Sequence, residues 1–227
     1  NGHDPKVLEK IWGDWEKFAS YAFNKSHATC YSWVAYQTAY LKAHYPAEYM
    51  AALMTRRFSQ ITEITKLMEE CQSMNIKTLG PDVNESYRAF GVNEHGEIRF
   101  GLSAIKGMGT PAADAIVAER EKNGPYKDIF DFAQRVDFSN VNRKAFESLA
   151  LSGGFDSFGI PRENFFAVNN KNEMFLDTLV RYGQLYQREQ HEAVTSLFGG
   201  LDAIEIATPP IPHAEGWSTI ERLNKER

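Results

Sequence analysis

The spacing of apolar residues along the first 75 positions is the feature that most limits the fold of this 227-residue chain. Apolar side chains recur every three or four residues, which is the period of an amphipathic α-helix. Asp4-Pro5 is a typical helix start, and Pro46 must interrupt any helix that runs through it. The pattern predicts four successive helices: from Asp4 to about Tyr21, from a cap at Ser26, after Pro46, and across 61–71.

The character of the sequence changes after Asn75. Residues 87–101 alternate around Asn93-Glu94-His95-Gly96, which predicts a short β-hairpin and a domain boundary nearby. Helical patterns resume at 112–122, 129–134, 142–151 and about 172–194, and a final helix starts near Trp217 after the extended, proline-rich stretch 208–212. The expected fold class is therefore mainly α, with a helical subdomain followed by a β-hairpin and a second helical domain.

Composition excludes several classes of protein. The chain is 43% hydrophobic, but its apolar stretches are broken before 18 residues, so no membrane span is expected. The two cysteines, Cys30 and Cys71, lie far apart, which favours buried thiols in a reducing cytoplasm over a disulfide. The first residue is Asn1 rather than Met, and we expect the chain to be a piece of a longer protein.

Positive charge gathers in one stretch of an otherwise acidic chain. The whole chain has a net charge of −5, whereas residues 17–57 hold five Lys or Arg and one Glu, a net charge of +4. Such a concentration predicts a polyanionic partner, with nucleotide or nucleic acid as the first candidate. Lys25-Ser26-His27 would hold a triphosphate at a helix N-terminus, although Ser26 could simply cap the helix. The aromatic residues nearby (Trp33, Tyr36 and Tyr40) are expected to be core.

The run Ala104-Ile105-Lys106-Gly107-Met108-Gly109-Thr110-Pro111 has the pattern of a helix-hairpin-helix turn. Two glycines would turn the backbone with positive φ, and Thr110 would cap a helix with Pro111 at its first position. Free N–H groups beside Lys106 would then suit a DNA phosphate. Residues 99–144 hold eight Lys or Arg and six Asp or Glu, a net charge of +2. An ordinary packed αα-hairpin is the alternative, and a second, degenerate hairpin is expected at 137–151.

Residue patterns for catalysis and metal binding are missing from the sequence. His27 and Cys30 are spaced for one face of a helix, but no second pair completes a zinc site. There is no GxSxG, no Walker A loop and no Asp-x-Asp. We therefore expect no catalytic residue, no metal ligand and no cofactor in this chain.

Several runs of residues closely resemble one family. The runs 21–28, 36–38, 41–52, 81–84, 101–109, 142–144 and 152–156 are similar, in order, to the alpha-subunit family of bacterial replicative DNA polymerase III, the C-family polymerases. The resemblance covers nearly all of residues 5–160. It implies that residues 1–80 are the distal part of a helical fingers domain. Residues 81–198 would be a clamp-binding domain with a tandem helix-hairpin-helix at about 101–159, and 199–227 a linker and the start of a following segment.

The resemblance also implies site residues. Tyr21, Asn24, Lys25, Ser26 and His27 would lie nearest the incoming nucleotide, and Lys106, Gly107, Met108, Gly109 and Thr110 would contact the duplex backbone. The carboxylates that bind Mg²⁺ in this family belong to a palm domain with no counterpart in this chain.

A further segment is similar to the peptides that bind bacterial sliding clamps. Val194-Thr195-Ser196-Leu197-Phe198 keeps the apolar pair of such peptides, but Val194 replaces the usual Gln. The apolar pair would fill a pocket on the clamp. Alternatively, Leu197-Phe198 is a helix C-terminus stopped by Gly199-Gly200.

The leading hypothesis is a segment of a DNA-directed DNA polymerase, a nucleotidyltransferase of the bacterial cytoplasm. Its expected partners are primer-template DNA, deoxynucleoside triphosphates, the sliding clamp and other subunits of the replicative holoenzyme, and the chain alone should be inactive. The alternative is a non-enzymatic helix-hairpin-helix DNA-binding or scaffold module. That alternative does not explain why the run Phe-Asn-Lys-Ser-His at 23–27 is present.

Overall fold

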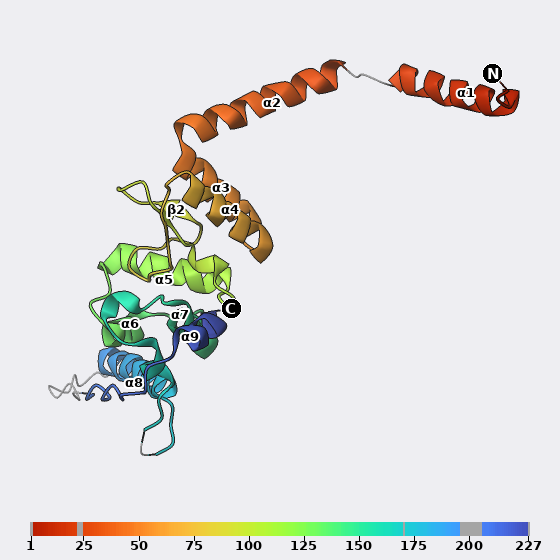
Figure 1. The fold of residues 1–227 in the computed structure, drawn as a ribbon. Helices are drawn as coiled ribbons and strands as arrows, with labels where there is room; N and C mark the ends of the chain where they lie inside the picture. Colours follow the sequence, from red (N-terminus) through yellow and green to blue (C-terminus); the bar gives the residue numbers. More distant parts are fainter. Residues whose placement is uncertain (1, 22–24, 170, 196–205, 227) are drawn as a thin grey trace. The chain divides into compact units, whose positions relative to one another are not determined.

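Figure 1 shows the computed structural model, which describes residues 2–21, 25–169, 171–195 and 206–226. Contacts between residues divide the chain into two units, Asn1–Pro46 and Ala47–Arg227. The predicted mainly helical fold is confirmed, with a small sheet in the second unit. The expected domain boundaries near residues 80 and 198 remain predictions.

The first unit consists of the helices α1 (Pro5–Tyr21) and α2 (Lys25–His44). Asp4 caps α1 as predicted, because its carboxylate accepts a hydrogen bond of 2.9 Å from the Lys6 N–H. The second cap was predicted wrongly: α2 already includes Lys25, so Ser26 lies inside the first turn.

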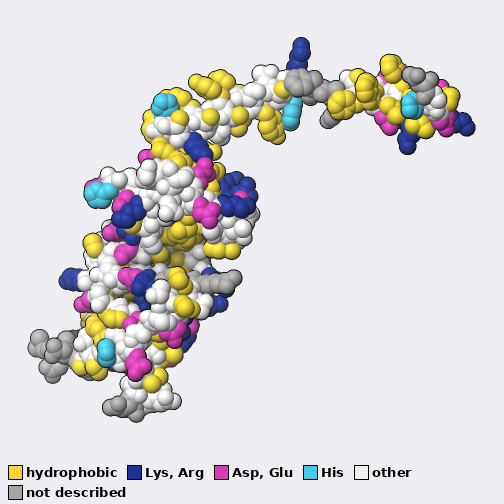
Figure 2. All heavy atoms as spheres, viewed as in Figure 1, with side chains coloured by type: hydrophobic (Ala, Val, Ile, Leu, Met, Phe, Trp, Pro, Cys, Tyr) yellow, Lys and Arg dark blue, Asp and Glu magenta, His cyan; other side chains and the backbone are white. Residues whose placement is uncertain are grey.

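The aromatic residues of α2 are also not core. Trp33, Tyr36 and Tyr40 are 63%, 64% and 49% exposed, and no described residue of α1 or α2 is buried. Figure 2 shows hydrophobic side chains on the surface of both helices. An aromatic stripe is buried only where a second element covers it, and the helical period of the sequence does not report whether one does.

The second unit begins at the second residue of α3 (Pro46–Arg57), and α3 shares a core with α4 (Ile61–Ser73). Met50 and Met54 of α3 and Ile64 and Cys71 of α4 are at most 2% exposed. Burial raises the pKa of the Cys71 thiol, as expected for a cysteine in apolar surroundings. Cys30 is exposed, so its predicted burial is wrong; both thiols are free.

A three-stranded sheet follows, in the order β1-β3-β2. The predicted hairpin is present: β2 (Gly91–Val92) and β3 (Ile98–Arg99) pair antiparallel, and the Asn93 side chain accepts hydrogen bonds from the N–H groups of His95 and Glu97. The parallel pairing of β1 (Thr78–Leu79) with β3 was not predicted, because two residues carry no visible alternation.

The helix-hairpin-helix region forms the second and larger core. It contains α5 (Thr110–Asn123), α6 (Ile129–Arg135), α7 (Arg143–Ser152) and α8 (Phe175–Thr195), with α8 packed beside α6 in Figure 1. Four phenylalanines that are at most 1% exposed fill its centre: Phe132, Phe146, Phe155 and Phe165. Short 3₁₀ turns occur at Leu102–Ala104 (η1), Asp156–Phe158 (η2) and Arg162–Phe166 (η3).

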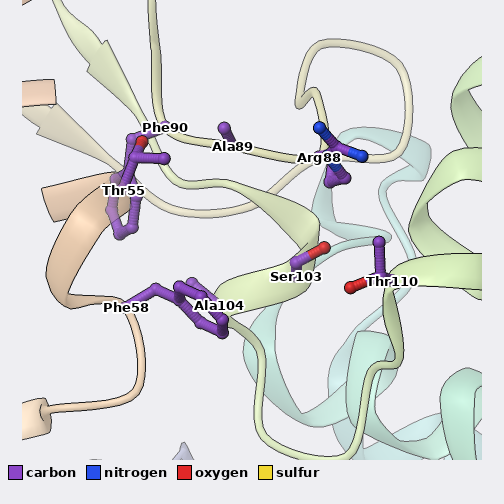
Figure 3. A pocket seen from close by; sticks show the side chains of 8 residues that line it. All are labelled: Thr55, Phe58, Arg88, Ala89, Phe90, Ser103, Ala104 and Thr110. Carbon is purple, nitrogen blue, oxygen red and sulfur yellow. The ribbon is translucent and has the colours of Figure 1, made fainter. Parts of the chain in front are cut away.

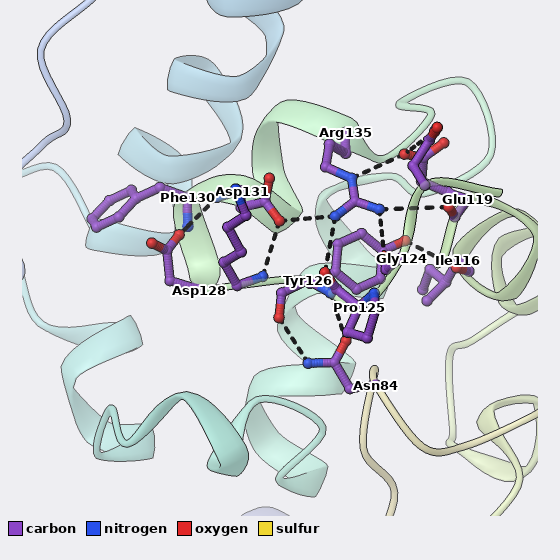
Figure 4. A network of polar contacts seen from close by, with 12 residues as sticks. Asn84, Ile116, Glu119, Gly124, Pro125, Tyr126, Asp128, Phe130, Asp131 and Arg135 are labelled. Atoms are coloured by element: carbon purple, nitrogen blue, oxygen red, sulfur yellow. Dashed lines mark hydrogen bonds and ion pairs between the residues drawn. The ribbon is translucent and has the colours of Figure 1, made fainter. Parts of the chain in front are cut away.

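Half-buried charged side chains and the buried Tyr126 fix the connections of this core. Figure 4 shows Arg135 of α6, which contacts Glu119 of α5 at 3.0 Å, Asp131 at 2.9 Å and the Gly124 carbonyl at 2.7 Å. The Tyr126 hydroxyl donates to the Ile116 carbonyl, and burial raises its pKa well above the ordinary value. The turn between α5 and α6 is therefore held by charge and hydrogen bonds as well as by apolar packing.

The C-terminal residues return to this core. Trp217 packs on Phe166 with ring centroids 5.5 Å apart, and the Lys225 ammonium of α9 (Thr219–Glu226) lies 4.7 Å from the Trp217 ring. The Ala214 N–H donates to the Asn164 side chain. Within the described residues, no helix has the length and apolar character needed to cross a bilayer.

Candidate nucleic-acid interface

The turn between η1 and α5 has two buried apolar side chains, and the residues next to them are exposed. Ile105 and Met108 are 7% and 6% exposed, and the Met108 N–H donates to the Ile105 carbonyl at 3.0 Å. Lys106, Gly107 and Gly109 between and beside them are exposed. Met108, one of the residues predicted to contact DNA, thus anchors the loop with its side chain and its N–H.

The two glycines of this turn differ in conformation. Gly107 has a φ of +89°, as predicted, but Gly109 has a φ of −81°, so the prediction of positive φ is wrong for it. A Cβ at Gly107 would lie 2.8 Å from Ser148 Oγ, which itself donates to the Lys106 carbonyl at 2.9 Å. A Cβ at Gly109 would meet nothing closer than 3.6 Å. Only Gly107 is therefore required by the protein's own packing.

The N-terminus of α5 lacks a side-chain cap. The N-cap is Gly109, and Thr110 is the first helical residue, so the prediction that Thr110 caps the helix is wrong by one position. Within the described part of the chain, the backbone N–H groups of Gly107, Gly109, Thr110 and Ala112 have no hydrogen-bond partner. Unpaired donors at the positive end of a 14-residue helix form a site for an anion.

A pocket of about 360 Å³ adjoins the same helix end. Figure 3 shows the Ser103 and Thr110 hydroxyls on one side of it, with Phe58 and Phe90 on the other. The Arg88 guanidinium at its rim lies 3.6 Å from the Asp114 carboxylate. Ser103 Oγ is buried and has no partner among the described residues. The pocket combines an apolar wall with hydroxyl groups next to the hairpin.

The second hairpin joins α6 to α7 at the predicted place, but its loop is acidic. The Asp137 carboxylate accepts from the N–H and hydroxyl of Ser139 and from the Asn140 side chain. These hydrogen bonds lower the pKa of Asp137. The bonds from Ser139 contribute most, and the bond from Asn140 contributes next. Asn142 caps α7 by accepting from the Ala145 N–H at 3.1 Å. The negative charge of Asp137 is unfavourable for a phosphate, so the first hairpin is the stronger candidate for a phosphate site.

The predicted nucleotide residues lie in the first unit. Lys25, Ser26 and His27 occupy the first turn of α2 with exposed side chains, and the His27 ring lies 4.3 Å from the Tyr31 ring. This turn holds a lysine and no acidic residue, which is the reverse of the charge that stabilises a helix N-terminus. Tyr21 is the last residue of α1, and Asn24 lies outside the described residues.

Most of the predicted clamp segment, 194–198, lies outside the described residues. Val194 and Thr195 are the last residues of α8, and Ser196, Leu197 and Phe198 lie outside the described residues. Among the residues that the structure describes, no three His, Cys, Asp or Glu side chains gather in a way that could hold a metal ion.

Charge is mixed over the second unit. Figure 2 shows Lys and Arg interspersed with Asp and Glu on the face in view. Several arginines near the hairpins are tied to carboxylates, for example Arg99 to Glu85 and Arg143 to Asp177. The hairpin is therefore distinguished by its unpaired N–H donors rather than by a broad basic surface.

The fold and this turn define a helix-hairpin-helix domain, and residues 75–165 match the helix-hairpin-helix motif family. Similarity to known proteins extends beyond those residues. The chain is 44% identical over 211 residues, 93% of its length, to DNA polymerase III subunit alpha of Chlamydia trachomatis. It is 48% and 38% identical to the proteins of the same name from Pasteurella multocida and Vibrio cholerae, over 100% of its length in both cases.

The chain is therefore homologous to one segment of the DNA polymerase III alpha subunit. It spans 16% of the length of the Chlamydia relative and 19% of the length of the other two.

Proposed function

We propose that this chain acts as a segment of a bacterial replicative DNA polymerase and holds duplex DNA by its phosphate backbone. The observation that supports this most is the set of unpaired N–H groups at Gly107, Gly109, Thr110 and Ala112, beside the exposed Lys106. A phosphate at this site would accept hydrogen bonds from the backbone and attract the ammonium. Such contacts position a duplex without reading its sequence, as a replicative polymerase requires.

The geometry of Gly109 supports the same proposal. Neither its φ of −81° nor its surroundings exclude a side chain. A glycine at such a position is explained if another molecule must approach the backbone closely. A phosphate group seated on the N-terminus of α5 would make that approach.

For the first unit, we propose that the first turn of α2 contacts the triphosphate of an incoming deoxynucleotide. The placement of Lys25 and His27 at a helix N-terminus without an acidic residue supports this, because a bound anion would offset the unfavourable charge. In the intact subunit, Lys25→Met should raise the KM for deoxynucleotides several-fold. An unchanged KM would exclude the contact.

We further propose that Val194 to Phe198 binds the sliding clamp through Leu197 and Phe198. The support is the resemblance of this segment to clamp-binding peptides. Replacing both apolar residues by alanine should weaken clamp binding, because the pair would fill a clamp pocket. Equal affinity of the double variant and the wild type in a clamp titration would dismiss this part of the proposal.

The catalytic activity itself, DNA-templated DNA synthesis with Mg²⁺, is proposed for the whole polymerase, together with its other holoenzyme partners and its cytoplasmic location. The described residues contain no metal-binding group of carboxylates, so no catalytic step is assigned to them. A module unrelated to polymerases is disfavoured, because similarity to the alpha subunits extends over 93–100% of the chain and not only over residues 75–165.

The test of duplex binding is a salt titration with a fluorescent DNA duplex and the 227-residue chain. The logarithm of the affinity should fall linearly with the logarithm of salt concentration, by about 0.9 per phosphate contact. Lys106→Met should reduce this slope by about one contact. Lys122→Met is the matched control, because Lys122 lies in the last turn of α5, at the end away from the hairpin.

Two results would contradict the proposal. One is the absence of duplex binding at low salt by a correctly folded chain. The other is equal affinity and equal salt dependence for the wild type, Lys106→Met and Lys122→Met, which would place the binding elsewhere.

A further inference from the structure

One lysine of the second hairpin lies against the turn of the first. A Cβ placed on Gly107 would lie 3.2 Å from Lys144 Cε and 3.8 Å from Lys144 Cγ. The aliphatic stem of Lys144 therefore covers the space that a side chain at position 107 would occupy. Its ammonium is one bond beyond Cε, so the charge lies at the edge of the hairpin turn.

The position of Lys144 is fixed by its own helix. Ser148 lies one turn further along α7, on the same face, and donates to the Lys106 carbonyl at 2.9 Å. Ser148 is 9% exposed, and this bond is partly shielded from water. The bond holds the face of α7 that carries Lys144 against the loop that carries Lys106.

Lys144 differs from the neighbouring Arg143 in that its charged group has no partner among the described residues. Arg143 is tied to Asp177 and to Glu147, both at 2.7 Å, and the Asp177 hydrogen bond contributes most to raising the pKa of its guanidinium. Lys144 is exposed and, among the described residues, has neither an ion pair nor a hydrogen bond from its ammonium. Of these two adjacent cations, Lys144 is the one available to an external anion.

From these contacts we propose that Lys144 is a second cation at the phosphate site of the first hairpin. The ligand is a phosphate diester of duplex DNA, bound between the Lys106 and Lys144 ammonium groups and the N–H groups of Gly107 and Gly109. The two hairpins would thus form the site together. The first supplies the N–H groups and Lys106, and α7 of the second supplies the Lys144 ammonium. This inference rests on the proposed duplex binding and adds a residue to it.

The packing of Ser148 and Lys144 against the turn also explains why position 107 must be glycine. A side chain there would collide with Ser148 Oγ and displace the Lys144 stem from the turn. Lys144 can approach the turn this closely only because position 107 has no Cβ.

The experiment compares Lys144→Met, Lys106→Met and Lys122→Met in the duplex salt titration. Methionine keeps an unbranched apolar stem and removes the charge. Lys144→Met should lower duplex affinity about tenfold at 50 mM salt and reduce the salt slope by roughly 0.9, as for one lost phosphate contact. Lys144→Arg keeps the positive charge and should retain most of the wild-type affinity and salt slope. Thermal unfolding of each variant checks that the fold is intact.

The outcomes separate the two proposals. If Lys106→Met weakens binding while Lys144→Met behaves like Lys122→Met, the role of Lys144 is overturned and the phosphate site of the hairpin stands. If the folded wild type does not bind duplex at all, the proposed function itself fails. A uniform loss in all three variants would mean that only net charge matters, and would also overturn the role of Lys144.

Discussion

At the scale of single residues, two constraints require a glycine at position 107: a positive φ and the close approach of Ser148. Gly96 has the first constraint without the second, so comparing the two glycines separates the effects. Gly107→Ala places a side chain at a φ of +89° and 2.8 Å from Ser148 Oγ. Gly96 has a similar φ of +75°, but a Cβ there would meet nothing within 4 Å. Gly96→Ala should therefore cost only about 1–2 kcal/mol of unfolding free energy, for the left-handed conformation.

Gly107→Ala should cost about 1 kcal/mol more than Gly96→Ala, because overpacking adds to the conformational term. Urea unfolding of both variants measures the difference. Equal losses would show that Ser148 and Lys144 move aside without cost, and that the contact between α7 and the hairpin is loose.

Acid stability is a second property of single residues. The Arg181 guanidinium, and then the Asn169 side chain, lower the pKa of Glu173 from 4.5 to about 2. A carboxylate whose pKa is lower in the folded state stabilises the fold above its unfolded pKa. That stabilisation is lost as the pH falls.

The contribution of Glu173 is therefore complete above about pH 4.5 and disappears toward about pH 2. Glu173→Gln should lower Tm at pH 6 and show a shallower loss of Tm between those two pH values. At pH 2 the two proteins should unfold at similar temperatures. Parallel Tm curves across the whole range would mean that the ion pair contributes nothing to stability.

The turn at 105–110 shows what residue patterns could predict. Its position and the positive φ of Gly107 follow from the sequence, because each depends on local backbone geometry. The negative φ of Gly109 and the contact of Lys144 with Gly107 do not. Lys144 is 37 residues away in the sequence, and only the packing of α7 brings it to the hairpin.

At the scale of elements, Arg120 connects α5 to the loop after β1. Its guanidinium is buried and donates to the carbonyls of Val83 and Ser86, both at 2.8 Å. Arg120→Met would leave two carbonyls without a donor, and should lower the unfolding free energy by about 2 kcal/mol.

Arg88→Met provides the control for Arg120→Met. Arg88 has a 60% exposed side chain and a single ion pair to Asp114 at 3.6 Å, so its loss should cost less than about 1 kcal/mol. Chemical denaturation of both variants tests the contrast. A loss for Arg120→Met no larger than that for Arg88→Met would mean that water replaces the guanidinium in the variant.

Elements with a strong local signal were predicted well. The helices of both units and the hairpin at 91–99 have the period or the turn residues that define them. The two-residue strand β1 and the 3₁₀ turn η1 are too short to produce a pattern. The exposure of Trp33 and Tyr36 was missed for another reason: an amphipathic or aromatic face indicates that something can cover it, but does not identify what.

At the scale of the whole molecule, we expect DNA binding and catalysis to belong to different parts of the polymerase. The described residues include the proposed phosphate site, and no metal-binding cluster is found among them. The pure 227-residue chain should therefore fail to extend a primed template with Mg²⁺ and all four deoxynucleotides. A matched reaction with an active polymerase checks the substrates. Extension by the chain alone, at a rate proportional to its concentration, would contradict this division.

The central claim is that the turn at 105–110 seats a DNA phosphate, and the amide NMR spectrum tests it most directly. A duplex of mixed sequence should shift the ¹H–¹⁵N signals of Gly107, Gly109 and Thr110 in a salt-dependent way, and leave that of Lys122 unchanged. Shifts confined to other parts of the chain, with the hairpin signals unmoved at saturating DNA, would contradict the claim.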